Sequence, residues 1–191
     1  MVDNIKKENL IEILDIVYLK IIRLNYSYRC IDVFIHSNMD YVFPDILWSL
    51  KYSFATDAFT TISALFQSGK YSFNNLIAYN VNFKEEYTKV KCKIKTNYPE
   101  IFNLRNKVYC HFQDKQKEKD VDDIIKKFYQ IFYQLISLHK KAMELFSINN
   151  ESIHMLSIKN FTELDKEYVE FSKRLFMLNN YAIIDYNKYN K

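Results

Sequence analysis

One short stretch of the chain combines an anion-binding side chain with a proton-transferring one. Arg105 and His111 lie six positions apart, and the amide Asn106 directly follows the arginine. The chain has 4 Arg against 23 Lys, so an Arg indicates a need for planar, two-pronged binding of an oxyanion. Histidine is the side chain best suited to move a proton near neutral pH. Together these residues suit the handling of a phosphodiester.

Helical geometry decides whether the two side chains can act together. On a helix with about 100° per residue, Arg105 and His111 fall roughly 60° to either side of the inward-facing Val108. A separation of roughly 120° is too large for both to grip one small group in a straight helix. Either the helix bends, or the Arg of one subunit acts beside the His of another across a two-fold axis. The second solution predicts a composite groove at a dimer interface.

The chemistry that this pair predicts is metal-independent cleavage of RNA. The 2′-hydroxyl attacks the adjacent phosphorus, His111 moves a proton as general base or acid, and Arg105 neutralises the developing charge. The product carries a 2′,3′-cyclic phosphate, and DNA is spared because it lacks the hydroxyl. The alternative is that the pair arose by chance and that His111 is a packed, hydrogen-bonded residue at the edge of an apolar face.

The elements that must position the pair are all predicted to be helical. A single Gly and two Pro leave few of the turns that hairpins and nucleotide-binding loops require. We therefore expect a compact all-α bundle of long antiparallel helices with additional short helices. Apolar residues at alternating spacings of four and three mark its two long helices. These stripes are Leu10, Leu14, Val17, Ile21, Leu24, Tyr28, Ile31, Ile35 and Val121, Ile124, Phe128, Ile131, Leu135, Leu138, Ala142, Leu145.

Shorter helices are expected between the two stripes. The first runs from Pro44 to about Gln67, is apolar nearly all round and therefore central, and stops at Gly69. Ser72 is expected to cap a short helix that continues through Tyr79.

The lysine-rich stretch before the motif is ambiguous. Residues 89–95 alternate with period two, which by itself indicates a strand. A lone strand has nothing to pair with in this chain, so we expect a helix and a loop. Asn97 or Tyr98 then caps the motif helix, which has Pro99 in its first turn.

The length of 191 residues fits one domain spanning 1–191, with a motif-bearing core at about 45–145. We expect a connecting loop over the charged run 114–123 and an amphipathic helix from about Asn160 to Leu178. The tail after Asn179 is expected to fray.

Composition narrows the classes of function. A formal charge of +4 and a pI near 8.7 permit nucleic-acid binding without requiring it. The His and Cys residues have no ligand spacing and there is no Gly-rich phosphate loop, so we expect no metal and no cofactor. Neither a signal-peptide core nor a long uncharged apolar run is present, which predicts a cytoplasmic protein without a membrane span.

Two further features could support the motif. Asp57 stands in an otherwise apolar helix, where it either pairs with Arg105 and orients it or faces solvent. The most basic local patch either attracts an RNA backbone or is simply a solvated face. This patch consists of Lys84, Lys89, Lys91, Lys93 and Lys95.

The run around the pair resembles a known family. Arg, four to six residues and then His, on a helix of an all-α bundle and with a polar residue after the Arg, is the signature of HEPN domains. Leu104-Arg105-Asn106-Lys107, followed by His111 and Asp114, is similar to the abortive-infection group of that superfamily. The stretches 60–66 and 72–77 also resemble that group, so the resemblance covers about residues 45–145.

The resemblance implies a dimeric HEPN-type endoribonuclease that acts as a toxin or phage-defence effector. Arg105 and His111 are its implied catalytic residues, and Asn106 is a supporting polar contact. Beside them we expect Lys107 and, from its place in an apolar helix, Asp57 as supporting residues. The implied partners are an RNA substrate, a second copy of the chain, and an antitoxin or the product of a neighbouring gene. Some HEPN domains are not catalytic, so the alternative is a helical interaction or dimerisation module that uses the same face.

Overall fold

The computed structural model of the chain describes residues 2–36, 44–103, 115–148, 170 and 173–174. Their helices are α1 (Val2–His36), α2 (Pro44–Leu65), α3 (Phe73–Leu76), α4 (Val81–Asn97), α5 (Pro99–Asn103) and α6 (Lys115–Leu145). These described ranges contain no strand, which confirms the predicted all-α class.

The two long helices carry the predicted stripes on their buried faces. From Leu10 to Ile31, every member of the α1 stripe is at most 7% exposed. The α6 stripe is buried from Ile124 to Ala142, while Leu145 at its end is half-buried. The side chains of Ile35 and Val121 lie outside the described residues. Burying an aliphatic or aromatic side chain contributes about 1.5–3 kcal/mol, so these stripes account for why both helices form.

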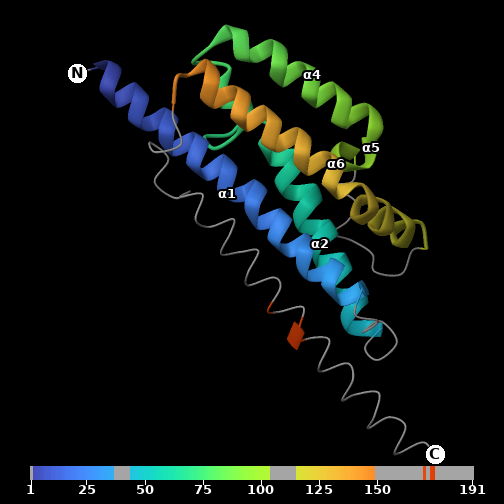
Figure 1. Cartoon of the computed structure of the whole chain (residues 1–191). Coiled ribbons are helices and arrows are strands. Elements are labelled where there is room, and N and C mark those ends of the chain that lie inside the picture. The colour runs from blue at the N-terminus through green and yellow to red at the C-terminus, as the bar shows by residue number, and fades with distance from the viewer. Residues whose placement is uncertain (1, 37–43, 104–114, 149–169, 171–172, 175–191) are drawn as a thin grey trace, which may run out of the picture.

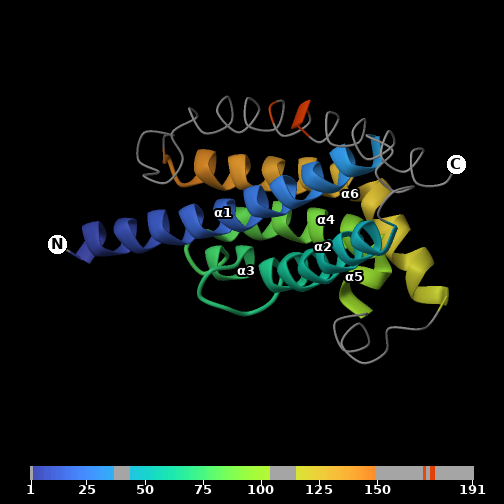
Figure 2. The ribbon, with the colours of Figure 1, turned by 90° about the horizontal axis from the view of Figure 1, so that it is seen from below.

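The two long helices pack as antiparallel neighbours. α1 contacts α2 and α6, and α6 also contacts α4, so that α6 lies between α1 and α4 (Figure 1). Along α1 and α6, Tyr28 stacks on Phe128, whereas Leu14 contacts His139, which gives the antiparallel direction. Figure 2 shows the same arrangement turned by 90°, with the short α3 and α5 at opposite ends of α2.

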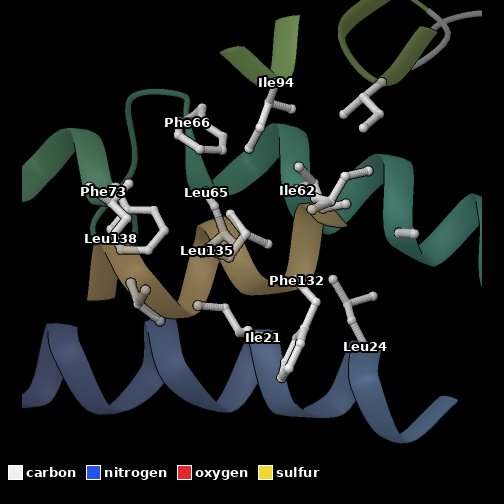
Figure 3. Close-up of a cluster of buried hydrophobic side chains, with 14 of the residues drawn as sticks. Ile21, Leu24, Ile62, Leu65, Phe66, Phe73, Ile94, Phe132, Leu135 and Leu138 are labelled. Carbon is white, nitrogen blue, oxygen red and sulfur yellow. The ribbon is translucent and has the colours of Figure 1, made fainter. Parts of the chain in front are cut away.

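The core lies where α1, α2, α4 and α6 meet. Figure 3 shows Ile21 and Leu24 of α1 pointing toward Ile62 and Leu65 of α2, with side chains of α6 between them. Phe66, just after α2, adds ring contacts with α3, α4 and α5. Its ring centroid lies 5.9 Å from Phe73, 5.7 Å from Tyr87 and 6.0 Å from Phe102.

Two expectations for α2 need correction. It is not central over its whole length, because Ile46 and Leu50 near its start are exposed. It also ends at Leu65, ahead of the predicted stop at Gly69, which has no positive φ and so does not cap the helix. Two side chains of α4 bind the carbonyl of Phe66 instead: the Tyr87 hydroxyl donates to it at 2.7 Å and the Lys91 ammonium at 3.1 Å.

The lysine-rich stretch is helical throughout, so the expected loop there is wrong. Phe83, Tyr87 and Ile94 are buried and Val90 is half-buried, a helical spacing that the alternating lysines obscured. Asn80 caps α4, its side chain accepting from the Asn82 N–H at 2.9 Å.

The expected connecting loop over 114–123 is also wrong, because α6 begins at Lys115. Lys, Gln and Glu are good helix formers, and the run contains neither Gly nor Pro. Pro99 begins α5 as predicted, with Asn97 the last residue of α4.

Ser72 caps α3 as predicted, accepting from the Asn75 N–H at 3.3 Å, but α3 ends at Leu76 instead of Tyr79. The expected tail after Asn179 lies outside the described residues, as does most of the helix expected over 160–178.

Candidate functional site

The predicted catalytic residues Arg105, Asn106 and His111 lie outside the described residues, as does Lys107. Their segment joins α5 to α6. The structure describes the elements on either side of it, which are the parts of the bundle that would hold such a site.

The side of the segment next to α5 is tied firmly to the bundle. Ile101 is fully buried, and the Phe102 ring packs against Phe66. Tyr98, which links α4 to α5, donates its hydroxyl to Gln130 Oε1 of α6 at 2.6 Å. The Lys127 ammonium lies 5.7 Å from the centre of the Tyr98 ring, a cation–π contact.

The side next to α6 is held by an ion pair. Lys51 Nζ of α2 lies 3.1 Å from Asp122 Oδ1, two turns into α6. Both flanks of the segment therefore have defined positions relative to α2 and to the core.

Asp57 has a partner that the sequence did not reveal. Its Oδ1 pairs with the Arg23 guanidinium of α1 and also accepts from the Thr61 hydroxyl at 3.4 Å. Arg23 is 68% exposed, and such exposed pairs contribute about 0–1 kcal/mol. Asp57 is thus neither buried nor simply solvated. Its expected contact with Arg105 involves a residue outside the described ranges and stays a prediction.

Asp57 also lines an apolar groove of about 390 Å³ between α1 and α2. Phe54 and Ile31 form its floor, and the exposed Tyr26 and Leu50 stand at its edge. Cys30 lies in the same groove, and burial raises the pKa of its thiol, so it is a poor nucleophile at neutral pH. The groove suits the binding of apolar side chains better than proton-transfer chemistry.

The predicted basic patch on α4 is only partly available to a ligand. Lys91 is half-buried and donates to the Phe66 carbonyl and to the Tyr87 hydroxyl. The other four lysines of the patch, Lys84, Lys89, Lys93 and Lys95, are exposed. At about 100° per residue they fall on two flanks of the helix. Lys89 and Lys93 share one flank with Glu86, and Lys84 and Lys95 share the other.

A second groove, of about 380 Å³, lies between α4 and α6 and was not foreseen from the sequence. Val90 and Ile136 supply apolar lining, Tyr133 presents an exposed ring, and Lys140 and Lys141 supply cations. The sequence nevertheless contained an indication of this groove. Of the four α6 residues named here, all but Lys141 share one flank of the helix. Together with Tyr129 they form an outward stripe spaced by four, three and four: Tyr129, Tyr133, Ile136 and Lys140.

His139 has a structural role. It is 2% exposed, its Nε2 donates to the Leu14 carbonyl at 3.0 Å, and its ring centroid lies 5.1 Å from that of Tyr18. Burial lowers the pKa of His139 to about 4, so the ring is neutral at pH 7.

Within the described ranges, no group of His, Cys, Asp and Glu is arranged to hold a metal ion. Among the helices of the same ranges, none has the length and apolar character to cross a membrane.

The chain has no match among family models, curated proteins or solved structures. Its functional interpretation therefore rests on its own residues and on the arrangement of its helices.

Proposed function

We propose that the chain is a metal-independent endoribonuclease of HEPN type, a toxin or abortive-infection effector that works as a homodimer. The observation that carries the proposal is the run Arg105-Asn106-Lys107 followed by His111. An all-α bundle and helices with defined positions on both sides of this run support it. An RNA strand is the proposed substrate, and an antitoxin or a neighbouring gene product is the proposed regulator.

The proposed reaction is an internal displacement at phosphorus. The bond from O2′ to phosphorus forms while the bond from phosphorus to the 5′-oxygen breaks, so the products are a 2′,3′-cyclic phosphate and a 5′-hydroxyl. One proton leaves the 2′-hydroxyl and one reaches the departing oxygen, and His111 performs one of these transfers. Arg105 neutralises charge on the non-bridging oxygens, and Asn106 donates a further hydrogen bond.

Cleavage in the presence of EDTA tests this proposal. We expect the wild-type dimer to cleave RNA but not DNA of the same sequence, and to leave a 2′,3′-cyclic phosphate. Arg105→Ala and His111→Ala should each lower the rate by about 10²–10⁴-fold. Lys7→Ala, at an exposed position on α1, is the matched control and should cleave like wild type. Equal cleavage by all four proteins, or none by wild type on varied RNAs, would refute the catalytic role.

A non-catalytic interaction module is the second candidate. The apolar groove between α1 and α2 favours it, because Tyr26 and Leu50 expose apolar surface at its edge. If this groove is the functional feature, Leu50→Asp should abolish self-association or partner capture while RNA cleavage stays absent in every variant. Light scattering after gel filtration measures the self-association.

A further inference from the structure

The groove between α4 and α6 combines an exposed aromatic ring with cations. The two helices lie side by side (Figure 1), and the groove of about 380 Å³ falls within the range of about 300–1,000 Å³ typical of small-ligand sites. Tyr133 is 66% exposed, so its ring is accessible to a ligand. Val90 and Ile136, both half-buried, supply apolar lining.

A second ring extends the aromatic surface along α6. Tyr129 lies one turn before Tyr133, and the two rings are nearly parallel, with centroids 6.5 Å apart and an interplanar angle of 27°. Tyr129 is also exposed. Successive bases of a single strand stack on such aromatic side chains, each stacked base contributing about 1–3 kcal/mol.

The charges around the groove favour an anionic ligand. Lys140 and Lys141 line it from α6, and Lys89 and Lys93 share the flank of α4 that also carries Glu86. Within the lining itself, the carboxylates of Glu86 and Glu144 balance Lys140 and Lys141. The surplus of positive charge comes from Lys89 and Lys93, which lie on α4 beyond the lining.

The ion pairs also favour an anionic ligand, because they leave one lysine of the groove without a carboxylate partner among the described residues. Glu144 binds Lys141 at 3.0 Å, whereas Lys140 forms no ion pair within the described part of the chain. Lys89 and Lys93 are about 6 Å apart along the helix axis, so the positive charge continues beyond a single phosphate.

We infer that the α4–α6 groove binds unpaired nucleotides of an RNA strand. Tyr133 stacks on a base, Tyr129 continues the stacking surface, and Lys140 with Lys89 contacts the phosphates. This inference rests on the proposed action on RNA and adds to it a positioning surface separate from Arg105 and His111. It also specifies the substrate as single-stranded at this point, because a paired base cannot stack on a side chain in this way.

Binding is measured separately from cleavage with a fluorescein-labelled 2′-fluoro oligonucleotide of twelve nucleotides. This strand lacks the 2′-hydroxyl nucleophile, so fluorescence anisotropy reports affinity alone. We expect Tyr133→Ala to weaken binding by roughly 5- to 160-fold. Tyr133→Phe keeps the ring and should bind nearly like wild type. Tyr79→Ala, an exposed tyrosine outside the groove, is the matched control and should also bind like wild type.

The lysines are tested through the salt dependence of binding. Lys140→Gln should lower the slope of log affinity against log salt by about 0.7, the value for one lost phosphate contact on a single strand. Lys7→Gln, at an exposed position on α1 outside the lining of the groove, should leave that slope unchanged. Circular dichroism melting verifies that each variant is folded.

Several results would overturn the inference. Unchanged affinity in Tyr133→Ala, equally tight binding of a duplex, or equal competition by free uridine monophosphate or polyglutamate would each do so. Cleavage that depends on Arg105 and His111 with unchanged binding in Tyr133→Ala removes only this inference. Tyr133-dependent binding without any cleavage by wild type removes only the proposed reaction.

Discussion

His139 is kept neutral by its surroundings. Its ring is buried between α1 and α6 and donates an N–H to the Leu14 carbonyl. Desolvation disfavours the imidazolium more than this hydrogen bond favours it, so the pKa falls from 6.5 to about 4. The residue therefore joins the two long helices and is not available as an acid or base at pH 7.

The lowered pKa of His139 predicts acid sensitivity. Between pH 6.5 and pH 4 the unfolded chain binds the proton and the folded chain does not, so stability falls as the pH drops through this window. We expect the free energy of unfolding to fall by about 2 kcal/mol between pH 7 and pH 4.5 from this residue. Urea denaturation at a series of pH values measures the change.

His139→Gln separates this effect from other titrating groups. Glutamine can still donate to the Leu14 carbonyl but does not titrate, so the same pH window should show a smaller loss of stability. An identical pH profile in the variant would show that His139 is not responsible.

At the scale of elements, α2 depends on α4 for its C-terminal end. The chain has no Gly close enough to Leu65 to cap the helix, and the Phe66 carbonyl is bound by Tyr87 and Lys91 instead. This contact also fixes α4 beside the start of the loop 66–72, close to Phe66 and its aromatic neighbours.

Tyr87→Phe should therefore destabilise the protein by at least about 0.5–1.5 kcal/mol, the usual net contribution of the one buried hydrogen bond to Phe66. The bond that the hydroxyl accepts from Lys91 is lost as well. The ring and its packing against Phe66 remain, so the loss reports the hydroxyl alone. Thermal melting followed by circular dichroism provides the measurement. Thr88→Ala, an exposed position on the same helix, should change stability by less than about 0.5 kcal/mol.

At the scale of the whole molecule, the described helices form one core that includes α1, α2, α4 and α6. This core also holds α5 and α6, the helices on either side of the segment with Arg105 and His111. In the proposed dimer, the site takes Arg105 and His111 either from one subunit or from two, and mixed dimers can test which.

Mixing Arg105→Ala and His111→Ala chains should restore activity if the site is shared between subunits. After random exchange half of the dimers are mixed, and each mixed dimer has one intact site of two, so about a quarter of wild-type activity returns. Cleavage assays before and after subunit exchange measure this recovery. If both residues act within one subunit, the mixture stays as inactive as each variant alone.

The amino-acid sequence by itself determined the all-α class, the two long helices, the cap at Ser72 and the start of α5 at Pro99. These features depend on residues within a few turns of one another. Local patterns, such as the spacing of apolar residues, therefore indicate them. Two predictions were wrong because another pattern competed with that spacing. The alternating lysines of α4 and the charged start of α6 each predicted a loop where the structure has a helix.

Only the tertiary structure decided which distant groups meet. Arg23 reaches Asp57 across 34 positions, Tyr87 reaches the Phe66 carbonyl across 21, and His139 reaches Leu14 across 125. Each contact depends on the angle and the register at which two helices pack. Many such packings would bury the same apolar stripes. The groove beside Tyr133 arose in the same way, since a surface between two helices exists only once both are packed.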